Sequence, residues 1–301
     1  MNKLKIAIVG YGNVGRSAME AISQEPDMEL VGIVRRKHSV GADQPLELSR
    51  TKIVGAITEL GKVDVAVLCG PTRSIKETAT EILKLGINTV DSFDIHGEIP
   101  GLRKDLGEVA RAHNAVSVIS AGWDPGVNSV IRGWFMAMAP KGITYTNYGP
   151  GMSMGHTVAV KAVKGVKNAL SITVPAGMGI HRRMVYVELE GGAAFEEVEK
   201  NIKQDPYFIK DRTYVTQVEN IENLIDMGHG VLMERKGVSG ITQNQIMKFE
   251  LKVNNPALTA QVMVSSARAT MKQKPGCYTM IEIPVVDYLC GGVDTYVKSL
   301  V

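Results

Sequence analysis

The chain has 301 residues, of which 45% are hydrophobic and 22% charged, a balance that is typical of a folded globular protein and excludes a disordered or fibrous one. The net charge of +3 is small and the basic residues are dispersed among acidic ones, which argues against nucleic acid as a partner. No apolar run reaches the roughly 20 residues of a membrane span, so we expect a cytoplasmic protein of two domains that does not bind membranes.

The first half of the chain alternates short β-branched runs with longer segments of helical periodicity. Continuous apolar runs, typical of buried parallel strands, occupy residues 5–9, 29–34, 63–69, 88–91 and 115–119. Apolar residues at helical spacing occupy residues 14–24, 74–85 and 99–112. This order predicts an α/β domain of residues 1–123, built on a Rossmann-type, doubly wound parallel sheet.

The pattern changes after Gly122-Trp123-Asp124-Pro125-Gly126, where residues that break regular structure precede longer, alternating segments. Residues 144–148, 171–174, 184–189, 213–218 and 246–253 are predicted strands of a second, α+β domain over residues 124–255. We expect these strands to form one open mixed or antiparallel sheet. A helix is predicted over residues 257–271, and we expect the C-terminal segment 256–301 to pack back onto the first domain.

A glycine motif follows the first predicted strand directly and opens the first predicted helix. Gly10-Tyr11-Gly12-Asn13-Val14-Gly15 matches G-x-G-x-x-G, the fingerprint of dinucleotide binding. The first glycine permits a tight turn, the second lets the backbone approach a pyrophosphate, and the third allows close helix–strand packing. The helix N-terminus attracts the phosphates through its free N–H groups. The alternative is a glycine-rich turn that serves packing only, and the strand–helix context favours dinucleotide binding over it.

Three basic residues, Arg35-Arg36-Lys37, end the second predicted strand. At this position an NAD-dependent enzyme places an acidic residue that holds the ribose 2′-hydroxyl. A guanidinium group instead binds a 2′-phosphate through planar, charge-assisted hydrogen bonds. The run therefore predicts NADP as the cofactor, and the alternative is a solvated basic turn.

Loops at the ends of later predicted strands carry further candidate ligands, because ligands of open α/β sheets bind at the carboxyl ends of the strands. Asp94 stands out, since a carboxylate near the nicotinamide can bind a substrate ammonium or assist its deprotonation. Its alternative role is to cap the helix that follows. The remaining predicted cofactor contacts are Cys69, Gly70, Pro71, Thr72, Ser92, Phe93, Asp94, Ala121, Gly122, Trp123, Asp124 and Pro125.

The three cysteines, Cys69, Cys277 and Cys290, lie far apart and form neither a disulfide framework nor a metal motif. No cluster of His, Cys and Asp residues has metal-ligand spacing, so we expect no metal. Semialdehyde dehydrogenases combine a similar nucleotide domain with an open sheet, but they need a thiol nucleophile in the second domain. Cys277 and Cys290 come too late in the chain for that role.

Longer strings of residues identify a family. The stretch 122–126 and the stretch Asn147-Tyr148-Gly149-Pro150-Gly151-Met152-Ser153-Met154-Gly155-His156 resemble the corresponding parts of the meso-diaminopimelate dehydrogenases, as do residues 9–15 and 26–32. The resemblance extends through essentially the whole chain. It implies the reversible, NADP-linked oxidative deamination of the D-centre of meso-2,6-diaminopimelate to L-2-amino-6-oxopimelate, ammonia and NADPH, in the metabolism of lysine and peptidoglycan precursors. It also implies a homodimer.

The resemblance further implies roles for individual residues. Asp94 and Asp124 would bind the substrate amino groups, and either is a candidate to take the ammonium proton. Trp123 and Tyr148 would form walls along the carbon chain of the substrate. Backbone contacts are implied for Met154 and Gly155, and binding of carboxylate and amine groups for Thr173, Arg183, His229 and Asn255.

Several of these residues also have plainer interpretations, and other functions compete with the implied one. Trp123 can serve core packing, Arg183 can be a surface charge, and His229, which lies in a predicted glycine-flanked loop, can be a buried structural histidine. The competing functions are a broader NADP-dependent D-amino acid dehydrogenase, a cyclic-imine reductase, and a regulator that binds NADPH without turnover. The reductase would be expected to carry a His-Lys pair, which is not seen here.

Overall fold

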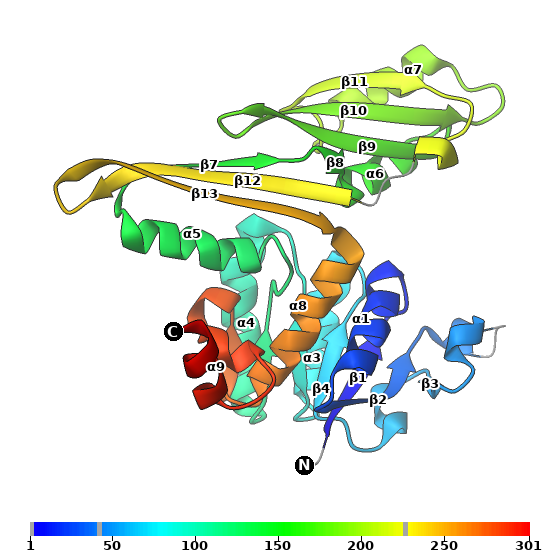
Figure 1. The fold of residues 1–301 in the computed structure, drawn as a ribbon. Coiled ribbons are helices and arrows are strands. Elements are labelled where there is room, and N and C mark those ends of the chain that lie inside the picture. The colour runs from blue at the N-terminus through cyan, green and yellow to red at the C-terminus, as the bar shows by residue number, and fades with distance from the viewer. Residues whose placement is uncertain (1–2, 41–43, 225–227) are drawn as a thin grey trace. The chain divides into compact units, whose positions relative to one another are not determined.

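The structure is a computed structural model that describes residues 3–40, 44–224 and 228–301. The chain divides into two compact units, unit 1 with residues 1–133 and 256–301, and unit 2 with residues 134–255 (Figure 1). The division falls inside the helix α5 (Val127–Met138), whereas the sequence placed the domain boundary between residues 123 and 124. The C-terminal segment 256–301 is part of unit 1.

Unit 1 is built on a parallel sheet that contains seven strands within the described residues. Its order is β14 (Gly276–Tyr278), β6 (Val116–Val118), β5 (Asn88–Asp91), β4 (Val65–Leu68), β1 (Leu4–Val9), β2 (Met28–Val34) and β3 (Ile53–Val54). The predicted Rossmann-type sheet is therefore confirmed, and the strand order reverses between β1 and β4, where such folds bind dinucleotides. The short edge strands β3 and β14 were not predicted.

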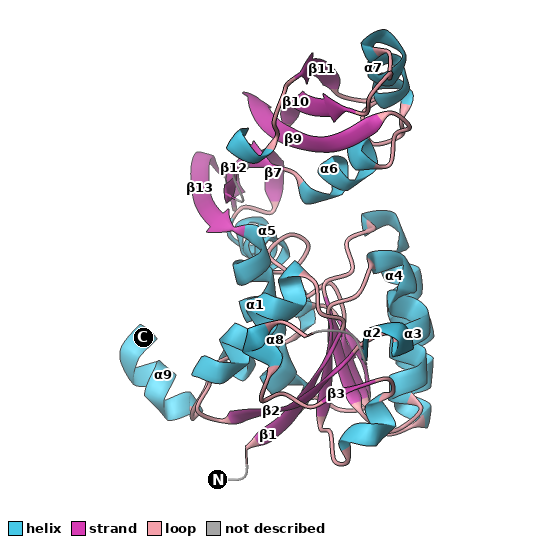
Figure 2. Cartoon of the chain, turned by 90° about the vertical axis from the view of Figure 1, so that its right-hand side faces the viewer, coloured by secondary structure: helices cyan, strands magenta, loops and turns pink. Residues whose placement is uncertain are grey.

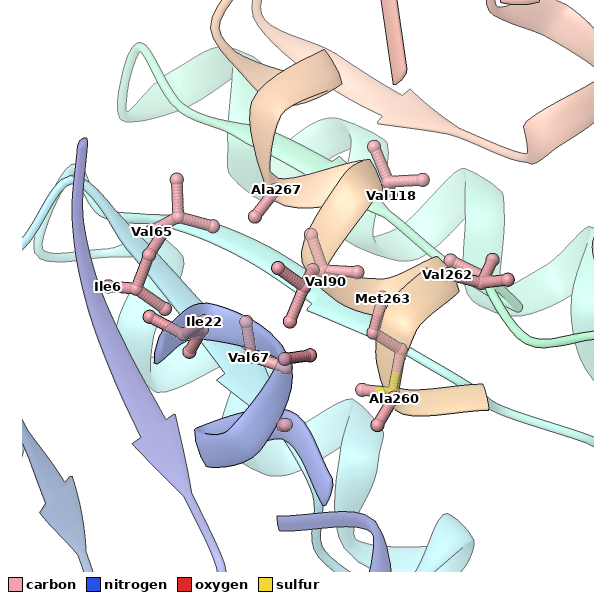
Figure 3. Packing of buried hydrophobic residues seen from close by; sticks show 14 of the residues in the cluster. Ile6, Ile22, Val65, Val67, Val90, Val118, Ala260, Val262, Met263 and Ala267 are labelled. Carbon is pink, nitrogen blue, oxygen red and sulfur yellow. The ribbon is translucent and has the colours of Figure 1, made fainter. Parts of the chain in front are cut away.

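Helices cover both faces of this sheet (Figure 2). The covering helices are α1 (Asn13–Gln24) and α8 (Asn255–Thr270) on one face, and α3 (Ile75–Leu83) and α4 (Ile99–Ala112) on the other. Unit 1 also contains α2 (Lys37–Val40) and α9 (Val293–Leu300), which contribute no side chain to these two cores. Side chains alternate along β1, so that Ile6 and Ile8 meet α1 and α8 on one face, while Ala7 meets α3 and α4 on the other. Figure 3 shows the first of these cores, in which Ala260 and Met263 of α8 lie over the central strands.

An ion-pair network joins α8 to the turn between α1 and β2. Arg268 of α8 is almost buried and forms ion pairs with Asp27 at 2.6 Å and with Glu25 at 2.7 Å. Its Nη1 also donates to the backbone oxygen of Tyr288. Hydrogen bonds to the two carboxylates raise the pKa of Arg268 and lower that of Asp27. The buried charge of Arg268 is therefore compensated by the two carboxylates, and these contacts attach the C-terminal segment 256–301 to the nucleotide-binding fold.

Within its described residues, unit 2 contains two sheets rather than the single sheet that was predicted. One has the order β11 (Arg212–Gln217), β10 (Ile180–Leu189), β9 (Val166–Gly177) and β8 (Gly151–Met152), with α6 (Met154–Lys161) and α7 (Phe195–Gln204). The other has the order β13 (Thr242–Asn254), β12 (Gly228–Ser239) and β7 (Lys141–Tyr148). The prediction was wrong because it missed β12, which pairs with both β13 and β7 and so separates them from the first sheet.

The composition of β12 explains the error. The strand contains three glycines and a run of charged residues, so it lacks the apolar alternation that indicates a strand. One of these charges, Arg235, is buried and donates to the backbone oxygen of Ala139, just beyond the end of α5, and to Thr144 Oγ1. The buried position is thus occupied by a cation that satisfies carbonyl groups at a helix C-terminus.

Short 3₁₀ helices complete the described structure: η1 (Leu46–Leu48), η2 (Ile57–Leu60), η3 (Thr72–Ser74), η4 (His96–Glu98), η5 (Glu222–Leu224), η6 (Met280–Glu282) and η7 (Val285–Tyr288). Within the described residues, none of the helices combines the length and the apolar character that a membrane span would need.

Candidate active site

The glycine motif forms the junction between β1 and α1. Gly10 has a φ of +95°, and a β-carbon there would lie 3.0 Å from the backbone oxygen of Cys69. A β-carbon on Gly15 would lie 2.3 Å from the backbone oxygen of Gly10, so the helix approaches the strand too closely for any other residue. Gly12 precedes the helix, and a β-carbon there would meet nothing within 4 Å. The junction thus combines close packing with open space in front of the helix N-terminus, where an anion is favoured.

The basic run after β2 lies next to this junction. The guanidinium carbon of Arg35 lies 5.9 Å from the ring centre of Tyr11, within the range of a cation–π contact. Arg35 Nη1 also donates to Gln44 Oε1 at 2.5 Å. Arg36 is exposed, and the side chain of Lys37 lies outside the described residues. Arg35 is therefore held beside the glycine loop, whereas Arg36 extends into solvent.

A buried carboxyl group, Asp91, fixes the loops that follow β5 and β6. Asp91 Oδ1 accepts hydrogen bonds from the backbone N–H groups of Phe93 and Ser120, and the Asp91 backbone oxygen accepts one from Ala121. The side chain is fully buried, and this burial raises its pKa to about 6 despite the two N–H donors. Asp91 thereby orders the segments that contain Ser92 to Asp94 and Ala121 to Pro125.

The two predicted acids of unit 1 have different surroundings. Asp94 is exposed and its Oδ1 accepts a hydrogen bond from Thr72 Oγ1 at 2.7 Å, so it connects the β4 and β5 loops rather than capping a helix. Asp124 has a side chain only 1% exposed and forms a bidentate ion pair with Arg132 of α5, at 2.9 and 2.8 Å. Trp123, next to Asp124, is buried as well.

Two of the predicted carboxylate- and amine-binding residues of unit 2, Thr173 and Arg183, lie in one row across its first sheet. Gly151, Thr173, Arg183 and Thr213 are direct cross-strand partners on β8, β9, β10 and β11. Arg183 is largely buried, its Nη1 donates to Thr173 Oγ1, and its Nε donates to Asp211 Oδ2 at 2.6 Å. The interpretation of Arg183 as a surface charge is therefore wrong, and the row offers a fixed guanidinium group beside a hydroxyl group.

His229 lies on β12, not in the loop that was predicted, and its side chain is buried. Burial lowers its pKa most strongly, the neighbouring Arg183 and His181 lower it further, and a hydrogen bond to the Gly151 backbone opposes them. A groove of about 690 Å³ in unit 2 is lined by His229 together with Asn147, Gly149 and Pro150. His229 is therefore a neutral imidazole on the wall of a groove.

Two histidines outside the predicted set also surround this region. His181 Nε2 accepts a hydrogen bond from the backbone N–H of Tyr148 at 2.7 Å, which requires a neutral ring with its proton on Nδ1. His156 contacts Ser153 Oγ through Nδ1 and the backbone oxygen of Tyr207 through Nε2. Burial lowers the pKa of His156 to about 4 and also lowers that of His181, and Arg183 contributes to both shifts.

The other predicted residues of unit 2 lie at element ends. Tyr148 ends β7, Met154 and Gly155 open α6, and Asn255 opens α8. Tyr148 is half-buried and its ring centre lies 5.5 Å from that of His181. The structure thus brings Thr173 and Arg183 together directly and relates His229 to them through Gly151.

Thiol chemistry is not favoured. Burial raises the pKa values of the Cys69 and Cys277 thiols to about 12, so neither provides a thiolate nucleophile near neutral pH. Within the described part of the chain, no three His, Cys, Asp or Glu residues are grouped as metal ligands.

Sequence reasoning missed the residues that orient the predicted ones. Asp91 ends a predicted strand but belongs to no ligand motif, and Arg132, His181 and Asp211 likewise carry no local motif. Arg132 lies on α5, eight residues beyond Asp124, which itself precedes the helix, so helical spacing does not predict their contact. The contacts of His181 and Asp211 span 33 and 28 residues, so no local pattern predicts them.

Two parts of the chain match family models of known proteins. Residues 10–115 match the family model for the NAD binding domain of homoserine dehydrogenase, and residues 122–182 match that for the diaminopimelic acid dehydrogenase C-terminal domain. Together with the fold and the glycine junction, they define a dehydrogenase with a nicotinamide dinucleotide-binding domain.

Relatives identify the family. A protein of Bacteroides fragilis named meso-diaminopimelate D-dehydrogenase is 60% identical over 100% of both chains, and that of Lysinibacillus sphaericus is 36% identical over 94% of this chain and 95% of its own. The solved structure of C. glutamicum DAP dehydrogenase in complex with DAP matches with a TM-score of 0.91 at 29% identity and covers both chains fully. An engineered D-amino acid dehydrogenase bound to NADP+ matches with a TM-score of 0.85 at 28% identity, also over 100% of both chains. The chain belongs to the meso-diaminopimelate D-dehydrogenase family.

The raised pKa of Asp91 predicts a pH-dependent stability. In the folded protein the proton is held up to a pH of about 6, whereas in the unfolded chain it leaves near 3.8, so stability falls as the pH rises through this window. Asp91→Asn keeps an oxygen acceptor without a charge, so its stability relative to wild type should increase by up to about 3 kcal/mol between pH 4 and pH 8. Urea unfolding followed by circular dichroism at both pH values measures the difference.

The matched control is Asp105→Asn, because the exposed Asp105 pairs with Lys76, which lowers its pKa. This control should not gain relative stability as the pH rises. An Asp91→Asn variant whose stability relative to wild type does not change with pH would contradict the burial argument.

Proposed function

We propose that this protein catalyses the reversible, NADP-linked oxidative deamination of the D-centre of meso-2,6-diaminopimelate. The products are L-2-amino-6-oxopimelate, ammonia and NADPH. The observation that carries the proposal is the 60% identity, over the whole chain, with the Bacteroides fragilis protein named meso-diaminopimelate D-dehydrogenase. The fixed guanidinium group of Arg183, beside Thr173 in unit 2, supports it, because a dicarboxylate substrate needs a fixed cation.

The β1–α1 junction fits the cofactor. The space in front of Gly12 allows a pyrophosphate to approach the backbone, and the first turn of α1 offers N–H groups to its oxygens. The loops at residues 69–72, 92–94 and 121–125, held in part by Asp91, complete the contacts. When it is bound, the cofactor accepts the hydride that leaves the D-centre.

Unit 2 supplies substrate recognition. Arg183 and Thr173 bind a substrate carboxylate, and His229 and Asn255 bind polar groups as neutral partners. Tyr148 lies along the carbon chain, while Met154 and Gly155 donate from the first turn of α6. Neutral histidines around Arg183 keep its charge available, because they add no cation that would draw the carboxylate elsewhere.

Unit 1 supplies the acids that handle the amino group. Asp94 and Asp124 bind the substrate ammonium, and either can take its proton if it lies within hydrogen-bond reach. Arg132 orients the Asp124 carboxylate through two hydrogen bonds, and Thr72 orients Asp94. Trp123 positions Asp124 and forms a wall of the substrate pocket.

We infer NADP rather than NAD as the cofactor from Arg35 and Arg36. Both follow β2, where an acidic residue would repel a 2′-phosphate. Replacing both arginines by alanine should weaken NADP binding by about 10- to 100-fold, since a charge-assisted hydrogen bond contributes about 1.5–3 kcal/mol. Binding of NAD should change by less than about threefold.

Isothermal titration calorimetry with each nucleotide measures this selectivity. Arg111→Ala, at the exposed end of α4, is the matched control and should leave both affinities unchanged. An equal loss of NAD and NADP affinity in the double variant would show that the arginines do not read the 2′-phosphate.

The stereochemistry of the substrate tests the proposed reaction. NADPH and ammonia should form with meso-diaminopimelate and NADP, whereas the LL isomer, which has no D-centre, should give none. Absorbance of NADPH and an ammonia assay provide the measurement. Turnover of a simple D-amino acid with none of meso-diaminopimelate would favour the broader D-amino acid dehydrogenase, a possibility that the match to the engineered D-amino acid dehydrogenase keeps in view.

A variant at Asp124 separates an enzyme from a nucleotide-binding regulator. Asp124→Asn should reduce turnover by at least about 100-fold, the usual range for a lost acid or base, while NADP binding stays within about threefold. A fully active Asp124→Asn protein would remove Asp124 from the catalytic assignment.

We also propose a homodimer formed through unit 2. Exposed apolar side chains occur there on the second half of α5 and on β7 and β13, among them Trp134, Met138, Ile143 and Ile246. Such surfaces are typical of subunit interfaces. Light scattering after gel filtration should give the mass of two chains for wild type and of one chain for Trp134→Glu/Met138→Glu. Val297→Glu on α9 of unit 1 should remain dimeric.

A further inference from the structure

The geometry points to Asp211 as a positioning residue that fixes the guanidinium group of Arg183 for anion binding. This inference rests on the proposed function, in which Arg183 binds a substrate carboxylate. Asp211 itself does not contact the substrate in this scheme. It acts through Arg183, so its effect separates into an orienting part and an electrostatic part.

Two hydrogen bonds hold the guanidinium group on different sides. Nε donates to Asp211 Oδ2 at 2.6 Å, and Nη1 donates to Thr173 Oγ1 from the neighbouring strand. Within the described part of the chain, Nη2 makes no hydrogen bond, so its two N–H groups remain available to a ligand. A long arginine side chain has many rotamers, and these contacts restrict it to one of them before a ligand arrives.

Asp211 is itself fixed by the turn that precedes β11. Its backbone N–H donates to the oxygen of Phe208, and its backbone oxygen accepts from Thr213 Oγ1 at 3.2 Å. Phe208 is fully buried in the core of unit 2, so the turn is attached to the sheet. Thr213 is the cross-strand partner of Arg183, which places Asp211 two residues away on the same face of the sheet.

The charge of Asp211 has the opposite effect on a bound anion. The side chains of Arg183 and Asp211 are only 13% and 22% exposed, so their charges interact in a partly desolvated environment. Asp211 offsets the charge of Arg183 and repels an incoming carboxylate, while the surrounding His156, His181 and His229 stay neutral near pH 8. The hydrogen bond from Arg183 to Asp211 therefore strengthens anion binding by orienting the guanidinium group, whereas the negative charge of Asp211 weakens it.

Substitutions separate the two effects because asparagine keeps the oxygen acceptor and alanine does not. In Asp211→Asn the acceptor for Nε remains and the repulsion is lost, so KM for meso-diaminopimelate should fall by roughly two- to fivefold. In Asp211→Ala the orientation is lost, and KM should rise by about tenfold. Asp211→Ser serves as a second truncation if the alanine variant does not fold, and its KM should also rise.

The matched control is Asp205, which lies in the same turn and accepts a hydrogen bond from the backbone N–H of Tyr207. Asp205→Ala perturbs the turn without contact to Arg183, so KM should stay within about twofold. Steady-state kinetics at pH 8 gives KM and kcat for each variant, and thermal unfolding reports whether the fold is retained.

Specific outcomes would overturn the inference. If asparagine raises KM as much as alanine does, Asp211 binds the substrate amine directly. If asparagine and alanine both lower KM, only its charge matters. If Asp205→Ala matches Asp211→Ala, the effect belongs to the turn as a whole.

Calorimetry with pimelate, a dicarboxylate without amino groups, distinguishes this inference from the proposed reaction. Wild type should bind pimelate, Asp211→Asn more tightly and Asp211→Ala about tenfold more weakly. Pimelate binding in this order without turnover of meso-diaminopimelate would contradict only the proposed reaction. Turnover with equal KM values in wild type, Asn and Ala proteins would contradict only the role of Asp211, and absence of both activities would contradict the two together.

Discussion

Close approach of one backbone segment to another is the constraint on which the candidate site depends. At Gly15, Gly126 and Gly149 an added β-carbon would lie 2.3, 1.9 and 2.2 Å from the backbone oxygens of Gly10, Gly122 and Thr173. No side chain fits at these distances. The glycines therefore let the first helix meet its strand, let the turn before α5 close, and let the segment after Tyr148 reach β9. Each of these contacts places a predicted cofactor or substrate residue.

Once the backbone is placed, buried polar groups fix the segments that carry the chemistry. In unit 1, Asp91 accepts hydrogen bonds from the backbone N–H groups of Phe93 and Ser120, in the loops that contain Asp94 and Asp124. Arg132 donates to both carboxylate oxygens of Asp124. In unit 2, Asp211 and Thr173 hold Arg183. The same arrangement recurs, because a charged side chain that binds a ligand is oriented by a neighbour that does not need to touch the ligand.

The sequence predicts those features whose interacting residues lie close together in the chain. It does not predict features that depend on residues far apart in the chain. The nucleotide-binding fold is predicted because its signals are local: an apolar strand, the glycines at positions 10, 12 and 15, and a helix that follows at once. The two sheets of unit 2 are not predicted because β12 satisfies its buried Arg235 only through residues about 90 positions away. His181 and Asp211 likewise gain their meaning from distant partners. Family resemblance points to Arg183 and His229, but it does not say what orients them.

Three histidines lie close enough to Arg183 for its charge to affect their pKa values. Burial and the charge of Arg183 both lower the pKa values of His156, His181 and His229, so the imidazoles remain neutral at the pH where the arginine is charged. His181 must be neutral for a further reason, since its Nε2 accepts the N–H of Tyr148. In the proposed function, a carboxylate bound at Arg183 would therefore meet an oriented cation with neutral hydrogen-bonding groups around it. Such a surface binds an anion in one orientation. A mobile cluster of positive charges would instead bind many anions without selecting the geometry that a stereospecific reaction requires.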